Sequence, residues 1–597
     1  MSIQYQRYKL FSRRSFMLGC GKIGLMGLLG AQMYRLQVIE SAKFKTMSDA
    51  NHIRLIPTPP IRGIIYDRNN NILALNKNNY RVILAKENEA HFEKTIENIL
   101  NIVELDDDQR KDFLYKVNNQ KKQRSIILFD NLSWKDLSSV EVNIPDLPGV
   151  YIEVGQTRYY PYNAICAHLI GYVGTVSKEE APNSSVMFHP DYKIGKNGIE
   201  KFFDERLQGI PGYREVEVDA YGNVIQEFSS NPSVPGEDIN LALNIKLQDL
   251  TYSLLDGKDA AVILMDVNTG EVLAMCSTPS YDPNKFTQGI SSDYWKKISS
   301  NTHSPLINKT ISQQYPPGSV FKIVTAAAIA EAGIDPNTTV HCGGSFWLGN
   351  HKFHCWKHEG HGSVNMPSAI QKSCNVYFYT MARRIGFEKI HEVAKKLGLG
   401  EKFDLGLIGE VGGILPNRAW KKKRLKQEWH PGDTLNCAIG HGFLATTPMQ
   451  LAVMTARIAS GKMVSPKLTA QYGGLNVKDV DLSEKTLNAL RTGMDMVVNK
   501  PGGTVFRHKI DNPKHAFAAK TGTAQVVALK HDSVTGKALN DNETWETAHH
   551  GWCVGYAPVD SPKFACAVIV EHGGSGSGAA APVLREVLLK VQEFMES

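Results

Sequence analysis

The sequence has few of the features that mark disulfide-rich, nucleic-acid-binding or polytopic membrane proteins. Its 597 residues include only nine cysteines, an odd number that leaves at least one thiol unpaired and excludes a disulfide scaffold. A formal charge of +7 is small for this length and argues against a dedicated nucleic-acid binder. There is one long apolar stretch, and there are no internal repeats or long low-complexity tracts. Hydrophobic residues make up 42% and allow ordinary globular cores in about three to five domains.

The one long apolar stretch lies near the N-terminus at residues 16–31 and is interrupted only by Lys22. Basic residues precede it, which favours a cytoplasmic N-terminus and export of everything that follows. A cleaved signal peptide is the alternative, because residues 12–17 resemble a twin-arginine signal. No small-x-small cleavage site follows the stretch. We therefore expect residues 1–40 to form a cytoplasmic tail and an uncleaved membrane anchor.

Composition and periodicity divide the rest of the chain and predict an α+β multidomain fold. Residues 41–85 and 149–236 are β-rich and form a predicted pedestal domain. Residues 86–148 interrupt it with charged, amphipathic helical stretches and form a predicted head subdomain. Residues 237–597 have strands at both ends and an Ala- and Leu-rich helical middle. This last pattern indicates an antiparallel sheet flanked by an inserted helical lobe.

The first motif with chemical meaning is the Ser-x-x-Lys sequence Ser319–Lys322. It follows Pro-Pro-Gly and precedes an Ala-rich run, so Ser319 should lie at or near a helix N-terminus, with Lys322 on the same face. A buried lysine loses its proton through desolvation and can then activate the serine hydroxyl as a neutral base. Helix N-terminal amides would help to stabilise a developing oxyanion. By itself, however, the pair is far more typical of an N-cap serine and a solvated lysine.

Two further motifs in the same predicted domain favour the chemical interpretation. Ser373–Asn375 lies between the helical stretch 366–372 and the apolar run 376–381, as an inter-helix loop would. Lys520–Thr523 lies within the predicted strand 516–527, where a glycine lets a ligand backbone approach the edge and Lys and Thr can hold a carboxylate. The order Ser-x-x-Lys, Ser-x-Asn, Lys-Thr-Gly is the signature of serine acyl-transfer enzymes of the penicillin-binding and β-lactamase type.

With these motifs the chain resembles the class B penicillin-binding proteins, which are monofunctional D,D-transpeptidases. The resemblance also includes the anchor, residues 62–68 and residues 195–200, and it covers nearly the whole chain. Residues 416–424 and 429–433 resemble the elongation-type members more than the division enzymes. The resemblance implies a single membrane helix, an elongated dimerisation-like pedestal with a head, and a transpeptidase domain with a five-stranded antiparallel sheet. It further implies a place in the bacterial inner membrane, with the catalytic domain in the periplasm.

The resemblance also implies a role for each motif residue in a transpeptidase or carboxypeptidase reaction. Ser319 would attack the D-Ala-D-Ala bond of a stem peptide with Lys322 as its base, and Ser373 and Asn375 would relay protons and position the amide. The terminal carboxylate would be bound by Lys520, Thr521 and Thr523 beside Gly522, and the backbone amides of Ser319 and Thr523 would form the oxyanion hole. No cofactor is required for this acyl transfer.

The partners that the resemblance implies are peptidoglycan stem peptides, β-lactams, the membrane, a SEDS-type glycan polymerase and other elongation-complex proteins, with no nucleic acid. Two other functions remain open. One is a non-catalytic scaffold that activates a membrane glycan polymerase through residues 41–235, against which the intact motifs argue. The other is a membrane-anchored β-lactamase or β-lactam sensor, which would not need the long segment before the catalytic domain.

Residues 341–361 hold five of the 19 histidines and two of the nine cysteines, which indicates a candidate metal site. Three cysteines and one histidine suit a tetrahedral structural zinc ion, although the spacing is not that of a compact finger. The candidate ligands are Cys342, Cys355, His361 and Cys374. Their positions resemble those of the zinc ligands in elongation-type members of the family. The alternatives are a Cys342–Cys355 disulfide and unligated loop residues. Because Cys374 lies inside the Ser-x-Asn motif, a metal here would fix the catalytic loop without taking part in the chemistry.

Three other positions have weaker signals. The chain has Gly440-His441-Gly442 where the family usually has Gly-Gln-Gly, which leaves the role of His441 open. His549 and His550 precede a predicted strand and could line a cleft, although such histidines are usually solvated. The basic run 421–424 is expected to be a solvated face, with contact to an anionic polymer as the less favoured reading.

Overall fold

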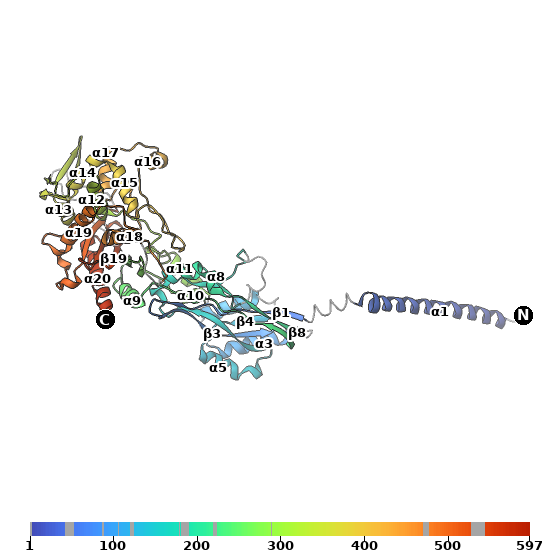
Figure 1. Cartoon of the computed structure of the whole chain (residues 1–597). Coiled ribbons are helices and arrows are strands. Elements are labelled where there is room, and N and C mark those ends of the chain that lie inside the picture. The colour runs from blue at the N-terminus through green and yellow to red at the C-terminus, as the bar shows by residue number, and fades with distance from the viewer. Residues whose placement is uncertain are drawn as a thin grey trace.

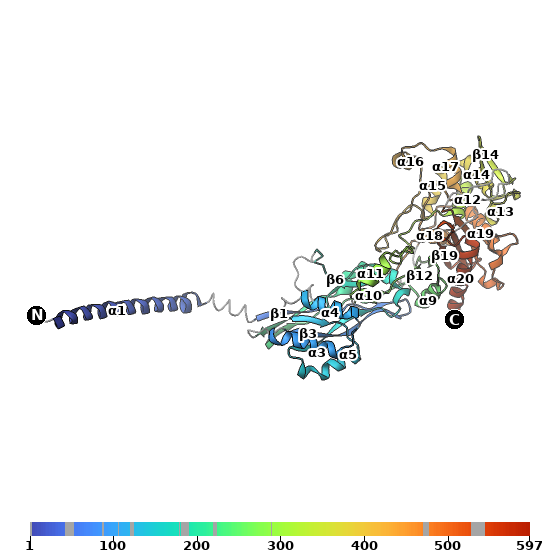
Figure 2. The ribbon, with the colours of Figure 1, turned by 180° about the vertical axis from the view of Figure 1, so that it is seen from behind.

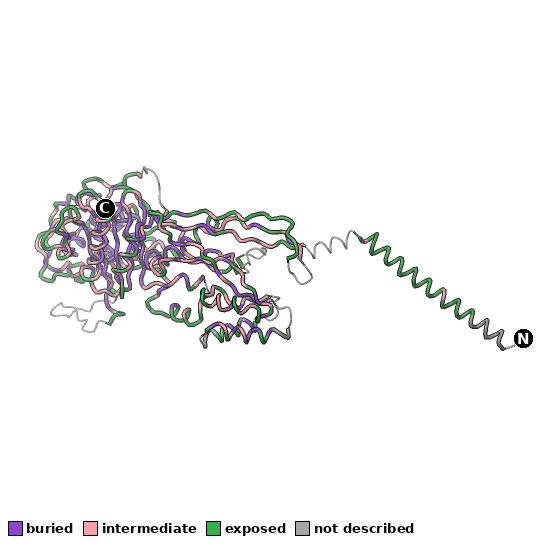
Figure 3. Tube along the Cα trace, turned by 90° about the horizontal axis from the view of Figure 1, so that it is seen from below, coloured by how far each residue is buried: buried purple, intermediate pink, exposed green. Residues whose placement is uncertain are grey.

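The computed structural model describes residues 3–41, 53–85, 89–105, 107–119, 125–177, 179–180, 190–218, 224–287, 289–469, 477–526 and 544–596. The molecule is elongated, with helix α1 (Ile3–Tyr34) at one end and the C-terminal unit at the other, and the view from behind shows the same order (Figures 1 and 2). Among the described residues, one helical segment, Ser12–Ile39, is long and apolar enough to cross a membrane, and none of it is buried (Figure 3). This agrees with the predicted single-pass anchor.

The N-terminal half is built on strands that are far apart in the sequence. Their bounds are β1 Ile53–Thr58, β2 Ile65–Tyr66, β3 Ile72–Ala85, β4 Ser125–Phe129, β5 Val150–Tyr159, β6 Val173–Thr175, β7 Lys193–Gly195, β8 Gly212–Val218, β9 Val224–Asn231 and β10 Ile239–Asn240. The larger sheet has the order β10–β2–β3–β4, with β5 also paired to β3, and the smaller sheet has the order β1–β8–β9. β10 pairs with β2 in parallel, and it leads directly into the C-terminal unit.

The segment between β3 and β5 has a hydrophobic core of its own. Its helices are α3 (Glu89–Ile102), α4 (Asp107–Asn119) and α5 (Trp134–Val142). Their apolar faces pack on β4, and the stacked rings of Phe113 and Phe129 lie 5.0 Å apart. The amphipathic helices predicted for this segment are therefore confirmed, because their apolar faces are buried in this core. The domain boundaries given above stay predictions.

A buried ionic junction ties together three distant segments of the N-terminal half, where the short helices are α6 Ala167–Ile170, α7 Gly198–Phe202 and α8 Asp204–Gln208. The carboxylate of Glu200 has no exposed surface and accepts hydrogen bonds from Arg62 Nε and Arg158 Nε, each at 2.7 Å. Burial opposes ionisation, but Arg158 and Arg62 lower the pKa of Glu200 overall. The two family motifs at residues 62–68 and 195–200 thus meet in one structural contact.

The C-terminal unit contains the predicted five-stranded antiparallel sheet. Its order is β12 (Val272–Thr278), β11 (Ala260–Asp266), β19 (Phe564–Val570), β18 (His550–Ala557) and β17 (Ala518–Ala524). All four pairings are antiparallel, and β17 is an edge strand. Every residue of β19 and nearly every residue of β18 is buried, so both faces of the sheet are covered (Figure 3).

The remaining elements of the C-terminal unit surround this sheet or form a lobe beyond it. The short strands β13 Val340–Cys342, β14 Ser345–Leu348, β15 His351–His354 and β16 Gly362–Val364 belong to the lobe. The helices are α9 Ile245–Ser253, α10 Asn284–Thr287, α11 Ser292–Ser299, α12 Lys322–Glu331, α13 Met366–Gln371, α14 Asn375–Ile385, α15 Phe387–Lys396, α16 Arg418–Leu425, α17 Pro431–Ala438, α18 Pro448–Ser460, α19 Glu484–Asn499 and α20 Ala581–Glu596. Helices α18 and α20 pack on β18 and β19, and α12 packs against α14, α15 and α19.

Removing the buried carboxylate should destabilise the N-terminal half. We expect Glu200→Ala to lower its free energy of unfolding by about 3–5 kcal/mol, because buried Arg158 then loses its counter-charge and Arg62 retains only that of Asp204. Glu237→Ala is the matched control, since its ion pair with Arg206 is exposed and should contribute at most about 1 kcal/mol. Calorimetry of both variants checks this, and equal thermal transitions would show that the junction is not a stability determinant.

Candidate active site

Ser319 lies in a tight turn that precedes helix α12. The turn is the 3-10 segment Gly318–Phe321, and the α-helix begins at Lys322. This agrees with the prediction that Ser319 lies at or near a helix N-terminus, where the 3-10 turn provides the N-terminal amides. Gly318 has φ +54°, and a Cβ there would lie 2.4 Å from the carbonyl oxygen of Thr523. Only glycine allows this turn to approach the Lys-Thr-Gly strand so closely.

Lys322 is fully buried among neutral oxygens. Its Nζ lies 2.8 Å from the carbonyl oxygen of Ser373, 3.1 Å from Ser373 Oγ and 2.6 Å from Asn375 Oδ1. Burial lowers the pKa of Lys322 to about 8, although the nearby cysteines Cys355 and Cys374 act in the opposite direction. The predicted pairing of Ser319 with a desolvated lysine therefore has the environment it needs, and the solvated-lysine interpretation is wrong.

The Ser-x-Asn motif is the predicted inter-helix loop. It connects α13 to α14, and Ser373 adopts a left-handed conformation with φ +53°, which is rare for a non-glycine residue. This conformation places Ser373 Oγ 3.1 Å from Lys322 Nζ and also 3.1 Å from Lys520 Nζ. Burial and then the charge of Lys322 lower the pKa of Lys520 well below its usual value. Two buried ammonium groups around one hydroxyl repel each other, so the site favours at least one neutral amine.

The Lys-Thr-Gly motif lies on the edge strand β17, as predicted, and its glycine packs closely against the Ser319 turn. A Cβ on Gly522 would lie 2.8 Å from the carbonyl oxygen of Pro317 and 3.2 Å from the backbone nitrogen of Val320. The absence of a side chain at Gly522 therefore lets the Ser319 turn pack on the strand. The approach of a ligand backbone to this edge stays a prediction. Beside it, Thr521 Oγ1 lies 2.8 Å from Thr504 Oγ1.

A cavity of about 890 Å³ opens between these motifs. Its lining includes the predicted residues Ser319, Ser373, Asn375 and 521–523, whereas Lys322 and Lys520 lie buried behind its wall. Other residues that line the cavity were not predicted from the sequence, and they are Trp356, Gly503, Thr504, Arg507, His508, Gln525 and 575–578. These come from loops and short turns without a motif, so no signal in a single sequence marks them.

Two of the histidines singled out in the sequence line the same cavity. His441 Nε2 lies 3.4 Å from the carbonyl oxygen of Thr523, and burial, with Lys322 nearby, lowers the pKa of His441 to about 4. His549 also lines the cavity and accepts a hydrogen bond at Nδ1 from the amide of Val526. His550 does not, because its ring faces Tyr315 on the opposite side of the strand.

The four candidate metal ligands converge beside the Ser-x-Asn loop. The ligand atoms of Cys342, Cys355, His361 and Cys374 all lie within 4.8 Å of one another. His361 Nδ1 is 3.6 Å from Cys342 Sγ and 3.5 Å from Cys355 Sγ, and a tetrahedral zinc site with its usual bond lengths has S···N edges of about 3.5 Å. The cysteines are all free, so the alternative of a Cys342–Cys355 disulfide is not formed. A hydrogen bond from Cys374 lowers the pKa of Cys355 to about 4, which favours a thiolate in the cluster.

The basic run differs in part from the expectation of a solvated face. Lys421 is buried, and its Nζ forms a 2.6 Å ion pair with Asp433. The next residues, 422–424, are exposed as predicted. The difference arises because α16 turns one side toward α17, where Asp433 lies in the first turn.

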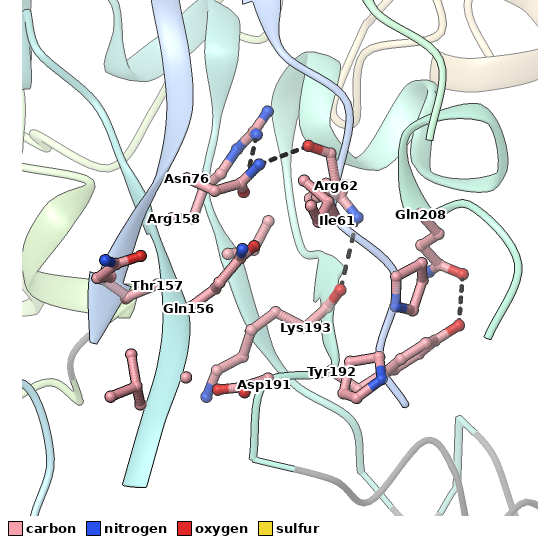
Figure 4. Close-up of a pocket in the computed structure, with 16 residues that line it drawn as sticks. Ile61, Arg62, Asn76, Gln156, Thr157, Arg158, Asp191, Tyr192, Lys193 and Gln208 are labelled. Atoms are coloured by element: carbon pink, nitrogen blue, oxygen red, sulfur yellow. Dashed lines mark hydrogen bonds between the residues drawn. The ribbon is translucent and has the colours of Figure 1, made fainter. Parts of the chain in front are cut away.

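A second cavity lies in the N-terminal half, away from the three motifs (Figure 4). Its polar lining groups bond largely to each other. Asn76 donates to the carbonyl oxygen of Arg62 at 2.6 Å, and Tyr192 donates to Gln208 at 2.9 Å. Because none of the motif residues reaches this cavity, we assign the chemistry to the cleft at Ser319.

Comparison with known proteins identifies the class to which this fold and site belong. The model of the penicillin-binding protein transpeptidase domain matches residues 260–589, and that of the penicillin-binding protein dimerisation domain matches residues 57–241. The chain therefore belongs to the penicillin-binding proteins that join these two domains, as the order of its motifs indicated.

Within this family, the chain is similar to particular proteins over nearly its full length. It is 34% identical to the peptidoglycan D,D-transpeptidase MrdA of Escherichia coli K12, covering 97% of this chain and 94% of that protein. It is 35% identical to MrdA of Acinetobacter baumannii, covering 98% and 89%. Among solved structures, it is similar to penicillin-binding protein PBP2 of Helicobacter pylori in complex with MreC, with a TM-score of 0.80, 31% identity and coverage of 91% and 99%. It is also similar to a peptidoglycan synthase complex that coordinates polymerization and crosslinking, with a TM-score of 0.70, 27% identity and coverage of 96% and 97%.

Proposed function

We propose that the protein is a serine D,D-transpeptidase that cross-links peptidoglycan stem peptides during cell elongation and is acylated by penicillins. The observation that carries this proposal is the convergence of three motifs on one cleft, with a buried lysine of lowered pKa behind the serine. The near full-length similarity to MrdA proteins supports the elongation role. Because all three motifs are intact, the site gives no support to a non-catalytic scaffold. A role in activating a glycan polymerase is compatible with transpeptidase activity.

In acylation, Ser319 Oγ attacks the carbonyl carbon of the penultimate D-Ala. Neutral Lys322 accepts the hydroxyl proton as the new C–O bond forms. The amide C–N bond then breaks, and the terminal D-Ala leaves as an amine that takes up this proton through the Ser373 hydroxyl, which contacts Lys322. Asn375 positions the substrate amide and also holds Lys322 in place.

The Lys-Thr-Gly edge binds the groups that carry negative charge. Thr521 and Thr523 line the cleft and hold the terminal carboxylate, while Lys520 supplies positive charge from behind the strand. The backbone amides of Ser319 and Thr523 donate to the oxyanion of the tetrahedral intermediate. An amine of a neighbouring stem peptide then attacks the acyl ester and forms the new amide bond. The C–O bond to Ser319 breaks, and the serine oxygen takes up the proton that the amine loses.

We further propose that the anchor α1 spans the bacterial inner membrane and that the catalytic unit lies in the periplasm. The apolar helix Ser12–Ile39 and the basic residues before it support this orientation. The likeness to a complex of PBP2 with MreC and to a peptidoglycan synthase complex supports partners of the elongation machinery, including a SEDS-type glycan polymerase.

The cluster of Cys342, Cys355, His361 and Cys374 suits a structural zinc ion. Its donor types and S···N separations fit a closed tetrahedral site, which leaves no position for substrate. Cys374 lies between Ser373 and Asn375, so a bound ion would hold the loop that contacts Lys322. The ion would supply rigidity only.

Fluorescent penicillin tests the nucleophile. We expect the wild-type protein to form a long-lived covalent adduct that peptide mapping places on Ser319, and Ser319→Ala to form none. Ser300→Ala, an exposed serine in the same unit, is the matched control and should label normally. An adduct on another residue would contradict the assignment, and rapid release of the penicillin would favour a β-lactamase.

The rate of acylation should depend on the ionisation of Lys322. Its pKa is lowered to about 8, and only the neutral amine accepts a proton. The rate should therefore rise about tenfold per pH unit below pH 8 and level off above it. Stopped-flow labelling between pH 6 and pH 10 checks this. A rate that is flat across this range, or still rising at pH 10, would show that Lys322 is not the base.

Metal analysis tests the cluster. We expect about one zinc ion per chain, lost in Cys374→Ser together with a large fall in the acylation rate, because the Ser-x-Asn loop loses its anchor. Cys566→Ala is the control, since this buried cysteine lies on β19 outside the cluster and should leave the zinc content unchanged. A metal-free wild-type protein with a normal acylation rate would refute the zinc assignment and leave the acyl-transfer proposal standing.

A further inference from the structure

The net positive charge of the chain is concentrated in the segment that contains α16 and the start of α17. Residues 416–433 hold six lysines or arginines and two acidic residues, which gives a net charge of +4, whereas the whole chain of 597 residues has +7. Whether such a run is only solvated or also binds an anion depends on which of its cations the protein already neutralises.

Helix α16 is firmly attached to the catalytic unit through residues on one of its sides. The Nζ of buried Lys421 pairs at 2.6 Å with Asp433 in the first turn of α17. The same carboxylate accepts a hydrogen bond at 2.7 Å from the backbone amide of His430, which closes the turn between the two helices. The ring of Trp420 lies 5.7 Å from that of Phe443. These contacts fix the orientation of α16, so its exposed side chains are presented from a stable support.

Three exposed cations at the end of α16 have no acidic partner in the described part of the chain. They are Lys423, Arg424 and Lys426, and none of them forms an ion pair with any described residue. The exposed cation before them differs, because Lys422 pairs with Glu428 at 2.9 Å. Unpaired charges of one sign repel each other at such short range, and an anion beside them relieves this repulsion. The end of α16 therefore suits a ligand that brings several negative charges.

The position of α16 indicates what kind of anion can reach it. Phe443, which packs against Trp420, is two residues after His441, and His441 lines the cleft. A polymer bound to α16 would therefore pass close to the reacting groups. The anchor α1 lies at the opposite end of the molecule in both views (Figures 1 and 2). The headgroups of a membrane around α1 are thus remote from α16, which favours a polymer over a lipid surface.

The substrate of the proposed reaction has the charge that this face requires. A stem peptide that ends in D-Ala-D-Ala has a terminal carboxylate, so a strand with many such peptides is a polyanion. Ammonium and guanidinium groups donate charge-assisted hydrogen bonds to carboxylates. One exposed ion pair contributes little by itself. Several contacts to the same polymer reinforce each other, however, because each further contact is intramolecular.

We propose that Lys423, Arg424 and Lys426 form a docking face that holds an anionic peptidoglycan strand beside the cleft. This inference rests on the proposed transpeptidase function, and it adds a contact with the polymer outside the cleft. Because the contact is exposed and electrostatic, it should weaken as the salt concentration rises.

Cosedimentation with insoluble peptidoglycan tests this face. The full-length protein is placed in phosphatidylcholine nanodiscs and acylated with penicillin, so that the cleft is occupied and only other surfaces can bind. We expect the variant that combines Lys423→Gln, Arg424→Gln and Lys426→Gln to bind about fivefold or more weakly than the wild-type protein. The difference should disappear at about 1 M salt, where the screening length is about 3 Å. It should also disappear when the carboxylates of the peptidoglycan are converted to amides.

Two matched variants separate the position of the charges from their number. Lys423→Arg combined with Lys426→Arg keeps the charge of the face and should bind as the wild-type protein does. Lys285→Gln, Lys296→Gln and Lys297→Gln together remove three exposed charges from α10 and α11, which lie away from α16 (Figures 1 and 2), and should also leave binding unchanged. Equal weakening in this variant and in the α16 variant would reveal a general charge effect and overturn the proposal.

Three other results would also overturn the proposal. They are a wild-type protein that does not bind peptidoglycan, an α16 variant that binds as well as the wild-type protein, and a difference that is lost in nanodiscs containing phosphatidylglycerol. The last result would show that the face binds anionic lipid. Failure of the transpeptidase proposal would be seen separately, because penicillin would not acylate Ser319 before peptidoglycan is added.

Discussion

The burial of the Lys322 amine among neutral oxygens is the constraint on which the rest of the site depends. A lysine in water is protonated at neutral pH and cannot accept a proton from serine. Three oxygens from Ser373 and Asn375 satisfy the amine without the counter-charge that a carboxylate would supply. An aspartate in place of Asn375 would raise the pKa of Lys322 and keep it charged. The amide of the Ser-x-Asn motif therefore follows from the requirement for a neutral base.

Burying this amine requires three segments of backbone to approach very closely. The Ser319 turn, the Lys-Thr-Gly strand and the segment before Gly440 meet at three glycines. A Cβ on Gly318 would lie 2.4 Å from the carbonyl oxygen of Thr523, and one on Gly440 would lie 1.9 Å from that of Gly318. Gly522 makes the corresponding approach from β17. The site is thus held by backbone packing, and the cluster of three cysteines and one histidine lies beside the Ser-x-Asn motif.

The N-terminal half shares one hydrophobic core with this catalytic unit and also contacts it through buried polar groups. Asp67 is fully buried and accepts a hydrogen bond at 3.0 Å from the amide of Ile245, at the start of α9. Asn284 and the backbone of Tyr160 bond to each other in both directions, at 2.9 and 3.0 Å. Together with the parallel pairing of β10 with β2, these contacts join the two halves of the chain. The family motif at residues 62–68 therefore has a structural role far from the cleft.

Much of the fold could be predicted from local patterns in the sequence. The predicted strand that carries the Lys-Thr-Gly motif, the amphipathic helices of the head and the apolar anchor agree with the structure to within a few residues, because the spacing of apolar residues is a local property of the sequence. The three motifs, in their order, were sufficient to indicate the family. The candidate zinc ligands could be proposed from residue type alone, before their atoms were known to converge.

Other features were decided only by tertiary structure. The sequence does not distinguish Lys421, which is buried against Asp433, from the exposed residues that follow it. It does not show that His549 lines the cleft while its neighbour His550 faces away, since adjacent residues of a strand point to opposite sides. Nor does it show that Arg507 joins the cleft or that Gly522 accommodates the Ser319 turn. The type of each residue and the spacing of apolar residues can be read from a short stretch of sequence. The burial of a side chain and the charges around it depend on segments that lie hundreds of residues away.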